Sequence, residues 1–144
     1  MNELPTNADA LVAAENDGYA LLIALLHDET RALCTGDVGV LERQASEKLA
    51  QVRSLERLFA ERQRLAGRRP PGATPANAAA LRLLHERAAE AKRINALNGR
   101  LIDRHQLYAS RSLAALRNAA GFPSLYGADG QSSQLASPAR RASA

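Results

Sequence analysis

The strongest constraint on the fold is the spacing of apolar residues between positions 38 and 66, where they recur every three or four residues. Charged arginines and glutamates fill the positions between them. The apolar positions are Leu41, Ala45, Leu49, Val52, Leu55 and Phe59. A repeat close to 3.6 residues predicts an amphipathic helix. This helix must end before Pro70-Pro71, because two prolines cannot continue it. We therefore predict a helix over 38–66.

A similar stretch precedes it and predicts a helix over 8–34. Its apolar positions are spaced three, four or seven residues apart along most of the stretch. They are Leu11, Tyr19, Leu22, Leu26 and Leu33. Positions 19–26 are apolar all round, which predicts contacts on more than one side. Gly36 is a typical helix stop, and Asp37 can cap the next helix. The pattern allows either a turn or a kink at this point.

The third stretch predicts a long helix over 75–120, with Thr74 as its cap and Pro75 in its first position. Its main apolar stripe consists of Leu81, Leu84, Ala88, Ala91, Ile94, Leu101, Tyr108 and Leu116. The apolar sector widens between residues 94 and 102. Because packing against one neighbour needs one stripe, the wider sector predicts a second partner.

Composition excludes most sheet-based folds. Alanine and leucine supply 52 of the 144 residues, whereas aromatic residues number five and valine plus isoleucine seven. Such a mixture favours helices and disfavours strands. We predict an all-α protein: an elongated antiparallel helical bundle or coiled coil of about three helices in 1–120. The segment 121–144 has three glycines, two prolines and five serines, which predicts a disordered tail with a docking motif at Phe122–Gly130.

Charge is segregated along the chain. Residues 1–36 carry −5, residues 37–75 carry +3, and residues 76–120 carry +5. An acidic first segment beside basic later ones favours attraction within a bundle. The net charge of +4 is modest, and no aromatic residues interleave the basic ones, so nucleic-acid binding is not expected.

Sites for catalysis, metals and cofactors are not expected. His27, His85 and His105 are far apart in sequence and none lies in a metal-binding motif, while the lone Cys34 cannot build a thiolate site. The single cysteine allows no intrachain disulfide and fits a reducing cytosol. The longest apolar run, residues 19–26, is too short to span a membrane. We expect a cytoplasmic, non-enzymatic interaction protein without membrane insertion.

Four short motifs carry a family resemblance. They are Leu-Leu-His-Asp-Glu-Thr (25–30), Leu-x-x-Gln-Ala-x-x-Lys (41–48), Ile-Asn-Ala-Leu-Asn-Gly-Arg-Leu-Ile (94–102) and Leu-Tyr-Gly-Ala-Asp-Gly (125–130). In this order they resemble FlgN, the flagellar type III export chaperone of the hook–filament junction proteins FlgK and FlgL. The basic, proline-rich linker 68–75 departs from the family pattern.

The resemblance implies a chaperone that binds the C-terminal amphipathic helices of FlgK and FlgL, prevents their premature assembly and delivers them to the FlhA cytosolic domain of the export gate. The widened apolar sector is where a groove for such a helix is expected. The expected substrate-binding residues are Ile94, Asn95, Leu97, Asn98, Leu101, Ile102 and Tyr108. Asn95 and Asn98 are candidates for hydrogen bonds across helices.

The same resemblance implies that the chain docks on the export gate through four residues of the tail, which are Leu125, Tyr126, Gly127 and Gly130. An alternative is that Leu125 and Tyr126 hold the tail against the bundle. The competing function is a structural coiled-coil scaffold, which would use the same apolar seams for self-association. A homo-oligomer is compatible with either function, because packing within one chain and packing between two chains share one pattern.

Overall fold

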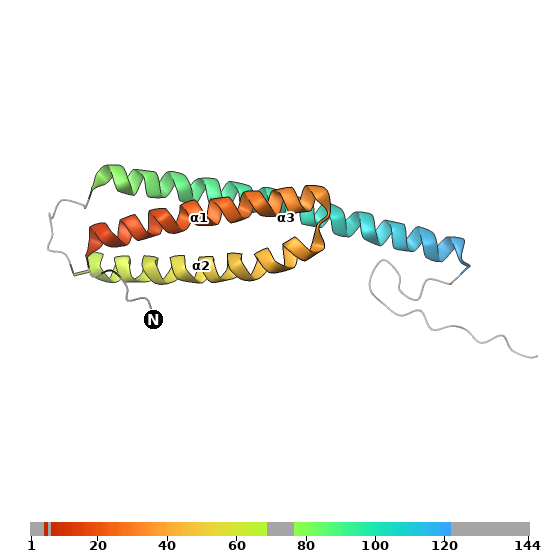
Figure 1. Cartoon of the computed structure of the whole chain (residues 1–144), viewed down its shortest axis with the longest axis horizontal. Coiled ribbons are helices and arrows are strands. Elements are labelled where there is room, and N and C mark those ends of the chain that lie inside the picture. Colours follow the sequence, from red (N-terminus) through yellow and green to blue (C-terminus); the bar gives the residue numbers. More distant parts are fainter. Residues whose placement is uncertain (1–4, 6, 69–76, 122–144) are drawn as a thin grey trace, which may run out of the picture. The chain divides into compact units, whose positions relative to one another are not determined.

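A computed structural model describes residues 5, 7–68 and 77–121 of the chain. These residues form three helices. They are α1 (Ala8–Thr35), α2 (Val38–Ala66) and α3 (Ala78–Ala119). Figure 1 shows the three helices coloured along the sequence, and no strand occurs in these residues. The all-α, three-helix expectation is confirmed. The chain divides into two compact units, Met1–Asp103 and Arg104–Ala144, and the division falls inside α3.

The break between α1 and α2 is a true turn. Gly36 adopts a left-handed conformation with φ of 72°, which ends α1. The Asp37 carboxylate then accepts a 3.0 Å hydrogen bond from the Val40 amide and caps α2. The predicted glycine stop and aspartate cap are both found, and they resolve the choice between turn and kink.

The start of α3 uses a different cap from the expected one. Thr74 and Pro75 lie outside the described residues. The helix begins at Ala78, where the Asn77 side chain accepts a 3.3 Å hydrogen bond from the Ala80 amide. Asparagine ranks with the best N-cap residues, so the chain has a suitable cap three positions after Thr74.

Within the first unit, α2 runs antiparallel to α1. Arg62 near the end of α2 pairs with Glu15 near the start of α1, and Lys48 pairs with Glu29 further along. The start of α1 therefore lies beside the end of α2, and the end of α1 lies beside the first half of α2. The short Gly36–Asp37 connection requires this reversal.

The first part of α3, up to Asp103, runs parallel to α1. Arg87 donates a 2.7 Å hydrogen bond to the carbonyl of Asn16, and Asn98 donates one of 2.9 Å to the carbonyl of Leu26. The unit is thus a three-helix bundle with alternating directions, and its helices lie side by side in Figure 1.

The core of this unit is small. Its central cluster of buried residues is Leu22, Leu26, Leu55, Ala91 and Ile94, and the partly buried Tyr19, Ile23 and Val52 pack against them. Gly18 allows α1 and α2 to approach closely, because a Cβ atom there would lie 2.7 Å from the Leu55 Cδ2 atom. The fully buried part of this cluster thus consists of leucine, isoleucine and alanine, and Tyr19 packs against it while only partly buried.

Candidate helix-binding groove

An open groove of about 650 Å³ lies on the first unit and draws residues from all three helices. Its apolar lining residues are Tyr19, Leu22 and Leu26 of α1, Ala45, Leu49 and Val52 of α2, and Ala88 and Ala91 of α3. Lys48, Lys92 and Asn95 complete the lining. The groove is therefore an apolar surface with a few polar groups, which is typical of a protein-binding or ligand-binding site.

The side chains themselves explain why the groove is open. Ala45 on α2 and Ala88 and Ala91 on α3 are too short to fill the space above the α1 leucines. Leu49 is 51% exposed although it belongs to the apolar seam of α2. Apolar surface at a seam position has no partner among the described residues, and such surface commonly marks an interaction site.

A smaller hollow of about 330 Å³ continues the apolar surface along α2. It shares Tyr19, Leu22 and Val52 with the groove and reaches Phe59, which is 50% exposed. Arg62 lies over the Phe59 ring, 5.4 Å from its centroid. The candidate surface is thus longer than the groove alone.

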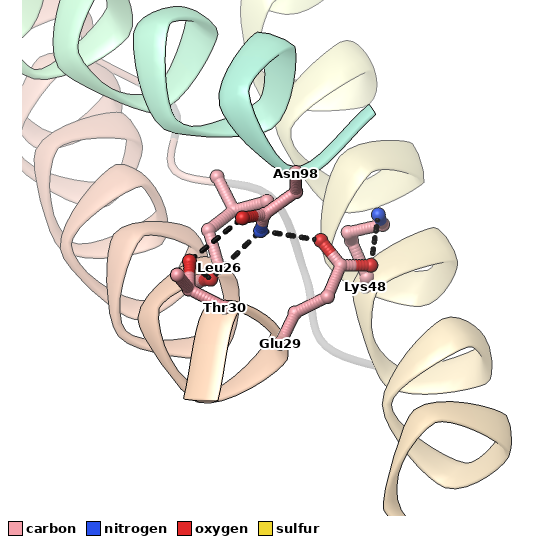
Figure 2. Close-up of polar contacts among 5 residues, drawn as sticks. All are labelled: Leu26, Glu29, Thr30, Lys48 and Asn98. Atoms are coloured by element: carbon pink, nitrogen blue, oxygen red, sulfur yellow. Dashed lines mark hydrogen bonds and ion pairs between the residues drawn. The ribbon is translucent and has the colours of Figure 1, made fainter. Parts of the chain in front are cut away.

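A buried polar network fixes the three helices beside the groove (Figure 2). The Asn98 side chain donates to the Leu26 carbonyl at 2.9 Å and to the Glu29 carboxylate at 2.8 Å, and it accepts from the Thr30 hydroxyl at 2.7 Å. Glu29 in turn pairs with Lys48 at 2.6 Å. Because Lys48 also lines the groove, the network connects one groove wall to the bundle interior.

A second polar cluster lies at the other end of the bundle. Glu15 is 2% exposed and receives two hydrogen bonds from Arg62, at 2.5 and 3.2 Å. Asn16 donates to the Ala80 carbonyl at 3.0 Å. Buried polar groups that are paired in this way fix which residues of neighbouring helices lie opposite one another.

The groove carries positive charge. Lys48 and Lys92 are its charged lining residues, and none of the lining residues is acidic. Next to Lys92 along the helix, Arg93 donates two 2.8 Å hydrogen bonds to Glu90. These hydrogen bonds hold the pKa of Glu90 below its usual value and raise the pKa of Arg93. Arg93 is therefore engaged within the chain.

The structure separates the residues that the sequence grouped as a substrate site. Ile94 and Asn98 are 2% and 1% exposed and point into the bundle. Asn95 lines the groove, and Leu97 is 37% exposed without lining it. The other three predicted residues are Leu101 and Ile102, both half-buried, and Tyr108, which belongs to the second unit and is 76% exposed.

The predicted gate-docking residues Leu125, Tyr126, Gly127 and Gly130 lie outside the described residues. The hydrogen bond expected of Asn98 across helices is present, and it joins α3 to α1 within the chain. Sequence reasoning did not single out the groove residues of α1 and α2. The signal that pointed to them was the all-round apolar stretch 19–26, which predicted contacts on more than one side.

Two further features of the described residues concern membranes and metal ions. None of their helices is long and apolar enough to cross a membrane. Within the same residues, no three histidine, cysteine, aspartate or glutamate side chains are grouped so as to hold a metal ion.

A three-helix bundle with an open apolar groove belongs to the class of helical proteins that can receive an amphipathic helix from a partner. The FlgN protein family model matches residues 1–134, so the chain belongs to the FlgN family, a chaperone family of flagellar assembly rather than an enzyme family. No curated protein and no solved structure gives a significant match.

Proposed function

We propose that this chain is a cytoplasmic export chaperone that binds the C-terminal amphipathic helices of the hook–filament junction proteins FlgK and FlgL. It keeps them soluble and unassembled until export. The observation that carries the proposal is the open apolar groove on a bundle of the FlgN family. An amphipathic helix laid in such a groove is a common mode of peptide recognition.

The groove offers the position of a fourth helix. A partner helix lying there would cover Leu49 of α2 and the α1 side chains at the groove floor, and it would convert three helices into a four-helix bundle. Burial of apolar surface on both partners drives the association. The partner is protected at the same time, because its own apolar face is no longer exposed to other subunits.

Within the substrate site expected on α3, Asn95 is the residue that the groove supports most directly. Leu97, Leu101 and Ile102 are proposed as a flanking contact surface on the first unit, and Tyr108 of the second unit is proposed as a separate contact for a longer substrate segment. Ile94 and Asn98 would act indirectly, by holding α3 in place from the bundle interior.

Delivery to the export gate is proposed for the motif Leu125, Tyr126, Gly127 and Gly130, with the FlhA cytosolic domain as receptor. The support is the resemblance of Leu-Tyr-Gly-Ala-Asp-Gly to the family's tail element, together with the match that extends to residue 134. Tyr126 is the residue proposed to contact the gate.

Co-purification with the C-terminal helices of FlgK and FlgL, analysed by size exclusion with light scattering, tests the proposal. We expect a discrete complex in which the junction-protein segment stays soluble. If the segment precipitates beside the chain, and the chain alone elutes as a stable coiled-coil oligomer, the scaffold function replaces the chaperone function.

A further inference from the structure

We propose that the groove selects helices whose apolar stripe is bordered by carboxylates, and that Lys92 pairs with one of them. The inference rests on the proposed function, and it specifies the chemistry of the helix that the groove receives. It also names the side chain that distinguishes one amphipathic helix from another.

The first step is the charge of the groove lining. Both of its ionisable charges at neutral pH are lysine ammonium groups, and no carboxylate lines it. The Lys48 ammonium is already met by Glu29, at 2.6 Å, and that carboxylate also accepts from Asn98. The charge of Lys48 is thus balanced within the bundle, and Lys92 supplies the charge that faces a partner.

The second step is the surroundings of Lys92 on its own helix. Side chains three and four residues apart on a helix are neighbours, and for Lys92 these are Ala88, Ala89, Asn95 and Ala96. None of them is acidic. Lys92 is exposed, and no carboxylate of the described residues forms an ion pair with it.

Three exposed arginines of the bundle, by contrast, are engaged within their own helices. Arg93 pairs with Glu90, Arg64 with Glu61, and Arg31 with Asp28, each three residues away on the same helix. What distinguishes Lys92 is that it also lines the apolar groove and has no carboxylate partner among the described residues. A carboxylate beside the apolar stripe of a docked helix would lie close enough to pair with it.

The third step compares the charge of the chain's own C-terminal segments with that of Lys92. The described part of the second unit, residues 104–121, contains three arginines and no acidic residue. Residues 122–144 contain two arginines and one aspartate. The acidic residues of α1 that face the other helices, Glu15 and Glu29, are engaged by Arg62 and Lys48. The charge complementarity of the groove thus points to a helix of another protein.

Two synthetic peptides and the full-length chain test the inference. The peptides share one leucine stripe and differ only in the residues that border it, which are glutamates in one and lysines in the other. Anisotropy titrations at low salt should show the glutamate peptide binding about fivefold more tightly, the effect of one to two exposed ion pairs. The difference should shrink as salt is added, because exposed charges are screened.

Lys92→Glu should reverse the preference, and Lys92→Gln should abolish it. The matched control is Arg111→Glu, which makes the same change of net charge on α3. Arg111 also has no acidic residue three or four positions away, and it lies in the second unit. This control should leave the preference for the glutamate peptide unchanged. Circular dichroism of each variant verifies that its helices are intact.

The outcomes separate the inference from the proposed function. Equal affinity of both peptides for the wild-type chain overturns the role of Lys92 while the chaperone function stands. If the peptides are bound too weakly to compare, the FlgK and FlgL helices replace them, and Lys92→Glu must weaken those complexes more than Arg111→Glu does. Failure of the chain to bind any of these helices rejects the proposed function itself. A change in the molar mass of the free chain on Lys92→Glu would show that a second copy covers the groove, which also overturns the inference.

Discussion

The side-chain amide of Asn98 donates a 2.8 Å hydrogen bond to the carboxylate of Glu29 (Figure 2). Through this contact a single carboxylate connects α3 with α2, because Glu29 also pairs with Lys48. Both Asn98 and Glu29 are buried, so their partners cannot be replaced easily by water. The pair therefore fixes the position of α3, and with it the alanines that form one wall of the groove.

Replacement of Asn98 by alanine tests this role. The Asn98→Ala change removes two donors and one acceptor from a buried site and leaves the Glu29 carboxylate with one fewer partner. We expect the free energy of unfolding to fall by about 3 kcal/mol, the upper part of the range for an unsatisfied buried group. Urea denaturation followed by circular dichroism measures it. The exposed Asn95, changed to alanine, is the control and should lose less than about 0.5 kcal/mol; equal losses at both positions would contradict the role of Asn98.

The ion pair between Glu15 and Arg62 makes a second prediction. Glu15 is 2% exposed, so Arg62→Met leaves a buried carboxylate without its counter-charge. We expect a loss of about 3 kcal/mol in the free energy of unfolding. Arg64→Met removes an exposed pair with Glu61 on the same helix and should change the stability very little. A thermal melt of both variants makes the comparison, and similar melting temperatures would show that the Glu15 pair is not a significant anchor.

Substitution by alanine should change the stability in opposite directions at two glycines that are close in sequence. Gly36 has a positive φ of 72°, which a Cβ atom disfavours, so Gly36→Ala should destabilise the fold by about 1 kcal/mol. Gly39 lies inside α2, and a Cβ atom there meets nothing closer than 3.7 Å. Gly39→Ala should stabilise the fold by about 0.5 kcal/mol through helix propensity. Chemical denaturation measures the free energy of unfolding of the two variants. A lower value for both would mean that helix propensity does not govern stability at the start of α2.

The sequence predicted the helices well because their signals are local. The three-and-four spacing placed α2 correctly at Val38–Ala66, and the residue types of Gly36 and Asp37 placed the turn before it. The first residue of α3 was harder to predict, because Thr74-Pro75 and Asn77 are both typical helix-start signals. Only the structure shows that the Asn77 side chain caps the helix.

The site was harder to predict because it depends on how helices face one another. Ile94 and Leu97 look equivalent as apolar residues in one sector, yet Ile94 points into the core and Leu97 outward. Asn98 was expected to make a hydrogen bond across helices, and it does so within the chain. The groove forms where small side chains on α2 and α3 lie opposite large ones on α1. The apolar pattern of a single helix does not show which residues of another helix lie opposite it.

A prediction about export concerns Tyr126. If Tyr126 contacts the gate, Tyr126→Ala should leave helicity and binding of the FlgK and FlgL helices unchanged while it weakens capture by the FlhA cytosolic domain by about tenfold or more, as for loss of an aromatic interface anchor. A pull-down with immobilised FlhA domain measures this capture. Phe122→Ala in the same segment is the control for loss of an aromatic residue. Undiminished capture of the Tyr126 variant would remove this residue from the docking motif.

The location of the substrate helix is decided by three leucine-to-aspartate changes. Leu49→Asp places a carboxylate on the groove wall, where a docked helix would have to bury it, so affinity for the FlgK or FlgL helix should fall by about a hundredfold. Leu21 is similarly exposed, at 52%, but lines no part of the groove, so Leu21→Asp should retain near-normal binding. Leu97→Asp alters the apolar sector of α3 outside the groove and distinguishes the two proposed surfaces. Calorimetric titration of the three folded variants gives the answer: a large loss at Leu49 places the helix in the groove, whereas a large loss at Leu97 with normal binding at Leu49 places it on the outer face of α3.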